Sequence, residues 1–336
     1  MLNFDESRFV SIQRGAVSLA RPIEDTVTGL VAGGARNLFF LGAGGAGVLM
    51  LPAAQLLDRS GALPVRLERA TEIVAMGSAD LGEGSIVVIP SLSGTTPESI
   101  AVLEFAQSRG ATVIALTGNA ESPVAEAADH NFSNFAEDDT SSESFYLQSL
   151  LLVLSVMRAR GQGDYGAVGA QLELLPELLL EVKRAFEPRA AELAEAFREE
   201  PYHVITGAGS TWAEAWYYGT CILEEMQWIK TRPIHASDFF HGTLELLEED
   251  TSLLIFKGED AARPLTDRVE DFASTISGKV SVLDAAMFEL PGITGEARAL
   301  ISPILIATVL ERLSAHLEVL RDHPLTTRRY YRRVSY

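Results

Sequence analysis

The chain has 336 residues, enough for two domains of ordinary size, and 47% of them are hydrophobic, which indicates folded cores rather than a disordered chain. Acidic residues outnumber Lys and Arg by 46 to 27, which gives a formal net charge of −19. This acidity argues against nucleic acid and anionic membrane surfaces as partners, although a local cluster of donors can still hold a small anion.

The N-terminal stretch MLNFDESRFV is too acidic and too poor in apolar residues for a signal peptide, and no run of eighteen apolar residues occurs. The single cysteine, Cys221, cannot form an intramolecular disulfide, and its apolar neighbours favour a buried thiol over a nucleophile. We therefore expect a cytoplasmic protein with no membrane partner.

Apolar strands recur in the same order in the two halves of the chain. The offset between the halves is 165 residues from Gly42 to Gly207 (207 − 42) and 167 residues from Ser85 to Ser252 (252 − 85). Segments with helical periodicity lie between the strands, which favours right-handed crossovers and parallel sheets. The pattern predicts a duplicated α/β unit, each half a three-layer sandwich with a mostly parallel five-stranded sheet. The paired strands are 37–41 with 203–206, 85–89 with 252–256, and 111–116 with 278–283.

The first predicted strand is followed by a glycine loop, Gly42-Ala43-Gly44-Gly45-Ala46-Gly47. The loop satisfies the dinucleotide fingerprint G-x-G-x-x-G, and Glu68 falls near the place of the acid that binds a coenzyme ribose. A nicotinamide-dependent dehydrogenase is therefore a competing hypothesis.

A second loop, Ser91-Leu92-Ser93-Gly94-Thr95-Thr96-Pro97-Glu98, follows a strand and opens a helix. Four hydroxyl groups, free backbone N–H groups and a helix N-terminus together favour a small tetrahedral anion, and Pro97 suits the first helical turn. For any one of these residues, a helix cap without a ligand is the alternative.

Beyond these loops, residues 142–158 and 172–198 are predicted to be helical, with a break at Gly161-Gln162-Gly163. A helix predicted over 301–320 ends before Pro324. It leaves a basic, aromatic tail, TTRRYYRRVSY, on an acidic protein, and we expect this tail to fold over another part of the molecule.

The segment from Cys221 to Glu245 holds a carboxylate, Glu225, and an imidazole, His241, at a spacing that suits proton transfer. A salt-bridging glutamate and a capping histidine are the alternative interpretation. Glu224 is adjacent, but neighbouring helix residues point about 100° apart, so only one of the two carboxylates faces a given cleft. We favour Glu225. His235 is a second imidazole that either contacts substrate or caps a strand end.

Three separated motifs resemble the sugar isomerase (SIS) superfamily. SLSGTTPES resembles the SIS phosphate loop, and HASDFFHGTLE and DHPLTTRRYY resemble two elements of fructosamine-6-phosphate deglycases. A tandem repeat joined by helices is also similar, more distantly, to the isomerase half of glucosamine-6-phosphate synthase. The resemblance implies a first SIS domain with anion-binding loops at 1–160, a helical linker at 161–200, and a second SIS domain at 201–336 with the catalytic segment and a lid tail.

The resemblance also implies roles for individual residues. Glu225 would transfer protons and His241 would open the sugar ring, the histidine often being contributed across a dimer interface in these families. Arg328 and Arg329 would close the site as a lid, with solvated charges as the alternative, while Ser141 and Glu143 would contact the sugar. The anion would bind residues of the two loops, namely Gly42, Gly44, Gly45, Ser91, Ser93, Gly94 and Thr96.

The chain departs from the family pattern in two places. The first loop lacks the serine or threonine that SIS phosphate loops often have, so a less charged anion such as a sulfonate is conceivable. Ile222 stands where the synthase has a lysine, and no glutaminase domain is visible, which together argue against aminotransfer.

The resulting expectation is a deglycase that converts a fructosamine 6-phosphate to an amine and an aldose 6-phosphate without a metal or cofactor. The alternatives are an aldose–ketose isomerase of a sugar phosphorylated or sulfonated at C6, and a non-catalytic sugar-phosphate sensor. A shared site predicts a homodimer or homotetramer.

Overall fold

The computed structural model describes residues 1–163, 165–331 and 333–335. These residues form two compact units. The first unit comprises residues 6–177, and the second comprises residues 1–5 together with residues 178–336. The change from one unit to the other falls inside the long helix α10 (Leu175–Phe197).

The sheet of the first unit has the strand order β2-β1-β3-β4-β5, and every neighbouring pair is parallel. The strands β1, β3 and β4 are buried along nearly their whole length because both of their faces are covered, as expected for a parallel sheet. The parallel arrangement predicted from the sequence is confirmed here. The strands are β1 (Asn37–Gly42), β2 (Val65–Arg69), β3 (Ser85–Ser91), β4 (Thr112–Thr117) and β5 (His130–Ser133).

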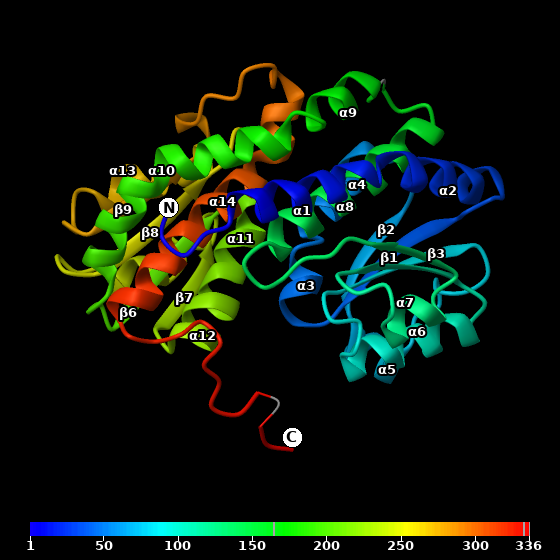
Figure 1. The fold of residues 1–336 in the computed structure, drawn as a ribbon, viewed down its shortest axis with the longest axis horizontal. Helices are drawn as coiled ribbons and strands as arrows, with labels where there is room; N and C mark the ends of the chain where they lie inside the picture. Colours follow the sequence, from blue (N-terminus) through cyan, green and yellow to red (C-terminus); the bar gives the residue numbers. More distant parts are fainter. Residues whose placement is uncertain (164, 332, 336) are drawn as a thin grey trace. The chain divides into compact units, whose positions relative to one another are not determined.

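Helices cover both faces of this sheet (Figure 1). On one face α5, α6 and α7 enclose a core that includes Phe39, Val87 and Leu103, and on the other face lie α1, α2, α4 and α8. The three layers follow from the alternation of strand and helix along the chain. The helices are α1 (Glu6–Ser18), α2 (Ala20–Ala32), α3 (Gly44–Val48), α4 (Leu51–Ser60), α5 (Ala70–Met76), α6 (Pro97–Ser108), α7 (Pro123–Ala127), α8 (Ser141–Ala159) and α9 (Gly166–Leu172).

The sheet of the second unit is also parallel, but among the described residues it has four strands in the order β7-β6-β8-β9. The sequence-based expectation of five strands in this half is wrong. After β9 the chain enters a short 3₁₀ turn and then reaches Pro291 and Gly292, which do not favour a further paired strand. The strands are β6 (Tyr202–Gly207), β7 (Lys230–His235), β8 (Ser252–Lys257) and β9 (Val280–Asp284).

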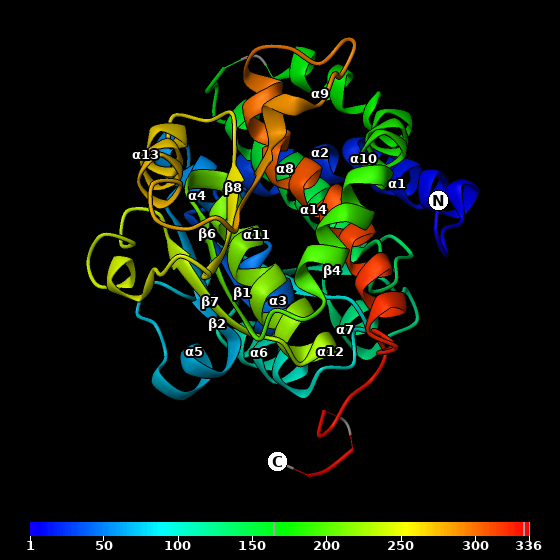
Figure 2. The ribbon, with the colours of Figure 1, turned by 90° about the vertical axis from the view of Figure 1, so that its left-hand side faces the viewer.

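Within the second unit, α13 (Arg263–Ala273) lies on one face of the sheet, and α11 (Trp212–Tyr217) and α14 (Glu296–Leu320) lie on the other, as Figures 1 and 2 both show. The helical segment between β6 and β7 is divided into three parts. A π-helical stretch, η2 (Tyr218–Glu224), separates α11 from the short helix α12 (Glu225–Gln227). Such stretches are often found at functional sites.

The helix α14 is long and apolar enough, by length and composition, to cross a membrane. However, 83% of its apolar window is buried inside the protein, as is common for the core helix of a soluble domain. Its apolarity is therefore explained by its place in the second unit.

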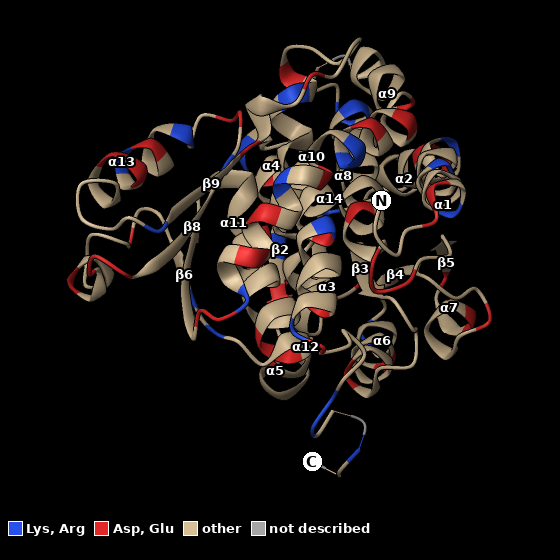
Figure 3. Cartoon of the chain, turned by 60° about the vertical axis from the view of Figure 1, so that its left-hand side comes forward, with Lys and Arg blue, Asp and Glu red and all other residues tan. Residues whose placement is uncertain are grey.

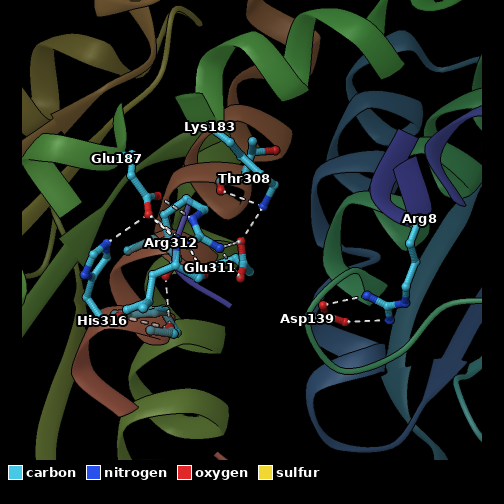
Figure 4. A network of polar contacts seen from close by, with 12 residues as sticks. Arg8, Asp139, Lys183, Glu187, Thr308, Glu311, Arg312 and His316 are labelled. Carbon is cyan, nitrogen blue, oxygen red and sulfur yellow. Dashed lines mark hydrogen bonds and ion pairs between the residues drawn. The ribbon is translucent and has the colours of Figure 1, made fainter. Parts of the chain in front are cut away.

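A network of buried charges fixes the N-terminal five residues to the second unit (Figure 4). The fully buried Arg312 donates from Nε to Glu187 (2.7 Å) and from Nη2 to the carbonyl oxygen of Leu2 (2.5 Å). The guanidinium group also lies 4.9 Å from the ring centre of Phe4. Burial alone would raise the pKa of Glu187, but the hydrogen bonds from Arg312 and from the backbone of Leu2 outweigh it and lower this pKa to about 2.

Candidate functional site

The strand order of the first unit locates a binding edge. The strand β1 lies between β2 and β3, so the chain continues from β1 to one side of the sheet and later returns to the other side. Ligands of open α/β sheets bind at such a switch point, outside the carboxyl ends of the strands. The glycine loop follows β1 and the serine loop follows β3. All seven residues predicted to bind an anion therefore lie at one edge of one sheet.

The glycine loop turns sharply from β1 into α3. A Cβ atom on Gly42 would clash with the backbone of Gly47, so glycine at these positions permits the close approach of strand and helix. Gly44 has φ +53°, and a Cβ atom there would meet no atom of the described chain within 4 Å. The backbone of this loop is therefore open to a small ligand.

The serine loop contributes a buried hydroxyl group, that of Ser91. Ser91 is 3% exposed, and its Oγ makes no hydrogen bond to the described residues. Gly94 has φ +62°, and a Cβ atom there would clash with Ser122. Thr96 occupies the N-cap of α6 without a side-chain capping bond, and Pro97 follows it at the start of the helix. Because buried hydroxyls normally have partners, Ser91 is suited to a bound anion.

The geometry of the glycine loop fits a dinucleotide-binding site only in part. Glu68 lies near the carboxyl end of β2, paired with Leu41 of β1. The helix that follows the fingerprint, however, ends after five residues at Val48, and the chain then turns into α4. The geometry alone leaves this alternative open.

Two further predicted residues, Ser141 and Glu143, lie in the first turn of α8, which follows the carboxyl end of β5. Both are buried, with Glu143 only 1% exposed. The Oγ of Ser141 lies 3.5 Å from the carbonyl oxygen of Asp138. These residues therefore belong to the same unit as the two loops.

The second unit distinguishes Glu225 from Glu224. Oε1 of Glu225 lies 3.0 Å from Nε of Arg328 in an ion pair, although the N–H is not aligned for a hydrogen bond. Glu224 instead accepts hydrogen bonds from the backbone N–H (3.1 Å) and the hydroxyl (2.8 Å) of Thr231. The two neighbouring carboxylates therefore have different partners, one in the tail and one at the start of β7.

The start of the C-terminal tail contacts Glu225 of α12 and Trp228 through Arg328 and Arg329, whereas Tyr330, Tyr331 and Val334 are exposed, so the expected folding of the tail over the protein is seen only at its start. Figure 3 shows the basic residues that the tail carries. The guanidinium of Arg329 lies 3.8 Å from the ring centre of Trp228, whose ring also contacts His323 at 4.5 Å. Gln227 donates to the carbonyl oxygen of His323 at 2.7 Å. The contacts of Trp228 with Arg329 and with His323 were not predicted from the sequence, although His323 belongs to the DHPLTTRRYY motif.

The two histidines of segment 221–245, His235 and His241, differ in their surroundings. His241 is exposed on the turn after β7, and its backbone N–H donates to Asp238 at 2.9 Å. His235 ends β7, with Nδ1 2.6 Å from Oγ of Ser237 and its ring 5.5 Å from that of Trp212. Burial lowers the pKa of His235, and the charge of Asp238 opposes that effect. His235 thus has local partners, whereas the ring of His241 faces solvent.

Cys221 lies in η2, just before Glu225, and burial raises its pKa to about 12, with Glu225, Glu214 and Glu224 adding to the effect. The thiol is therefore protonated at neutral pH, which disfavours a nucleophilic role. Across the described ranges, no group of three or more His, Cys, Asp or Glu side chains is placed to hold a metal ion.

Comparison with known proteins identifies the family. The SIS domain model matches residues 34–158. Fructosamine deglycase FrlB of Bacillus subtilis is 31% identical over 89% of this chain and 92% of its own length, and fructoselysine 6-phosphate deglycase of Escherichia coli K12 is 28% identical over 83% and 80%. The crystal structure of a proposed phosphosugar isomerase from Bacillus subtilis superposes with a TM-score of 0.85 at 30% identity, over 90% of this chain and 93% of that one. The membership predicted from the three sequence motifs is confirmed, and the chain belongs to the SIS-domain family.

Proposed function

We propose that this protein is a sugar-phosphate deglycase that converts a fructosamine 6-phosphate and water to an aldose 6-phosphate and a free amine. The observation that carries the proposal is the similarity, over nearly the whole length of both chains, to a protein named as a fructosamine deglycase. The second unit acts as a second SIS domain, and the enzyme works without a metal or cofactor, as a homodimer or homotetramer in the cytoplasm.

The phosphate binds at the switch point of the first unit. Backbone N–H groups of Gly44 and Gly45, the unpartnered hydroxyl of Ser91, and the hydroxyls of Ser93 and Thr96 supply donors at the N-terminus of α6. A helix N-terminus favours a negative group there. Ser141 and Glu143 contact the sugar.

Glu225 moves the proton that drives the reaction. In the opened ketoamine it removes a proton from C1, which gives an enolamine, and a proton is then added at C2, which gives an imine. Water adds to the imine carbon, and the C–N bond breaks to release the amine. Arg328 lies beside Glu225, so the tail places a positive charge next to the proposed base.

His241 opens the sugar ring by transferring a proton to the ring oxygen. Its exposed position on the turn after β7 suits a residue that reaches the substrate bound by a second copy of the chain. Arg328 and Arg329 act as the lid, held by Glu225 and by Trp228.

An aldose–ketose isomerase is the second candidate. Glu225 would serve it equally, because an enediol forms from the same proton removal. The glycine loop, with no serine or threonine at Gly44 to Ala46, favours a sulfonate as much as a phosphate for this candidate.

An NMR time course with a fructosamine 6-phosphate, fructose 6-phosphate and a 6-sulfo-sugar distinguishes the possibilities. Release of amine and aldose 6-phosphate from the first compound alone is the expected result. Aldose–ketose interconversion of either of the others would favour the isomerase, and no reaction with any of them would contradict both and favour a sensor. A fluorescence titration with the nicotinamide dinucleotide should show no binding.

A further inference from the structure

The second unit has a switch point of its own. In both sheets the first strand in the chain lies between the next two, β1 between β2 and β3, and β6 between β7 and β8. The loops after β6 and β8 therefore occupy the places that the glycine and serine loops occupy in the first unit. By the same rule they would form an anion site.

The residues of the two switch points correspond closely. Gly209, after β6, has φ +56°, close to the +53° of Gly44 after β1. The offset from Ser85 in β3 to Ser252 in β8 is 167 residues (252 − 85), and the same offset takes Ser93 to residue 260 (93 + 167). That residue is Asp260, so a carboxylate stands where the first unit has a hydroxyl group.

Asp260 lies in the loop after β8, and its carboxylate contacts Ser210 in the loop after β6. Its Oδ2 accepts hydrogen bonds from the backbone N–H (2.8 Å) and from Oγ (2.7 Å) of Ser210, and its Oδ1 accepts from the backbone N–H of Ala262 at 2.9 Å. A Cβ atom on Gly209 would lie only 2.5 Å from this carboxylate. The carboxylate is therefore bound by backbone and hydroxyl donors in the manner of a small anion.

The hydroxyl groups around this loop are also engaged. Thr211 donates to the carbonyl oxygens of Ala208 and Phe256, both at 3.0 Å, and Oγ of Ser302 accepts from the backbone N–H of Glu259 at 3.0 Å. This differs from the first unit, where no described residue pairs with Oγ of Ser91 or lies within 4 Å of a Cβ atom placed on Gly44.

We infer that the second switch point is an anion site closed by the chain's own carboxylate, Asp260, so that each chain binds one small tetrahedral anion, at the first unit. Anion binding at the first unit rests on the proposed function, whereas closure of the second switch point rests on the contacts of Asp260. Replacing Asp260 with the serine found at position 93 should open the second site.

Equilibrium dialysis against radiolabelled inorganic phosphate tests the inference. We expect one bound phosphate per wild-type chain and two per Asp260→Ser chain, and the additional one should be lost when Ser210→Ala is added. Asp271→Ser is the matched control, because it removes the same charge from an exposed position of α13 and should leave one bound phosphate.

The possible results separate this inference from the proposed function. No phosphate on the wild type but one on Asp260→Ser would support the closed site and contradict the anion site of the first unit. An equal number on both folded proteins, two on the wild type, or a gain in Asp271→Ser as well would overturn the inference. Should Asp260→Ser not fold, Asp260→Asn is the second variant, because it retains an acceptor for Ser210. Phosphate should displace its neutral amide, so this variant should also bind two phosphates per chain.

Discussion

Nε of Arg328 lies 3.0 Å from Oε1 of Glu225, so the C-terminal tail supplies a cation to the carboxylate proposed as the base. Arg328 is also fixed by its own segment, because its Nη1 donates to the carbonyl oxygens of Leu325 (2.6 Å) and Thr327 (3.0 Å). Its side chain is only 13% exposed, which strengthens the interaction relative to a surface pair. The tail and the catalytic segment are therefore coupled within one unit.

Removal of this cation should slow the chemical step. We expect Arg328→Ala to lower kcat about tenfold, the equivalent of about 1.4 kcal/mol, with a smaller change in KM. Arg328→Lys should restore part of the loss, because it retains the charge. Arg329→Ala, which removes only the contact with Trp228, is the control and should have the smaller effect on kcat. Equal losses in the two alanine variants would contradict a specific role for Arg328.

Ser91 should act on binding of the substrate anion. A hydrogen bond to a charged group contributes about 1.5–3 kcal/mol, so Ser91→Ala should raise KM for the phosphorylated substrate at least about tenfold. KM for the unphosphorylated fructosamine should not change. Ser108→Ala, at the exposed far end of α6, is the control. Steady-state kinetics with both substrates provide the test, and equal effects on both would show that Ser91 does not contact the phosphate.

The buried His203 should make stability depend on pH. Burial lowers its pKa from 6.5 to about 4; the charge of Glu200 opposes this, whereas Arg321 and Lys279 add to it. His203 is therefore protonated near pH 6.5 in the unfolded chain but only near pH 4 in the folded protein. The contribution of His203 to the free energy of unfolding should be fully present above pH 6.5. It should fall by about 3 kcal/mol as the pH is lowered from 6.5 to 4.

Urea unfolding across that pH range measures the contribution of His203. His203→Gln should be less stable at pH 7.5, because the ring contact with Phe197 (4.7 Å) is lost, but its stability should vary less with pH. His241→Gln, at an exposed position, should retain the wild-type slope. The same slope in His203→Gln and the wild type would assign the pH dependence to other groups.

The charge network of Figure 4 should be costly to break. Arg312→Ala removes the buried guanidinium that pairs with Glu187, whereas Glu311 keeps its ion pair with the buried Lys183, and the loss of one partner of a buried ion pair commonly costs about 3–5 kcal/mol. Arg21→Ala removes an ion pair with Asp25 in which the arginine is 80% exposed, so it should cost less than about 1 kcal/mol. Thermal unfolding of the two variants provides the comparison, and similar melting temperatures would contradict the structural role of Arg312.

Much of the fold could be predicted from the sequence because several strands have a short apolar interior and end at, or directly before, a glycine or serine. Asn37–Gly42 and Ser252–Lys257 are of this kind, and both are strands. The loops after β1 and β3 could be predicted for the same reason, since an unusual run of glycines or hydroxyls directly after a buried strand has few structural explanations.

The remaining features depend on contacts between distant residues. The sequence period around Tyr218–Glu224 does not distinguish an α-helix from the π-helical stretch that separates α11 from α12. The pairing of Asp260 with Ser210 and the attachment of residues 1–5 to α14 through Arg312 likewise arise only from the tertiary fold. The fifth strand of the second sheet was expected by analogy with the first half, but Pro291 and Gly292 stand after β9.

The most direct test of the central claim compares amine release from a fructosamine 6-phosphate by the wild type, Glu225→Gln and Glu224→Gln. General-base removal costs at least about 100-fold, so Glu225→Gln should lose at least that much in kcat. Glu224→Gln still accepts from Thr231 and should remain within a few-fold of the wild type. If Glu225→Gln kept more than about a tenth of the wild-type rate, or if Glu224→Gln were the inactive variant, Glu225 would not be the base.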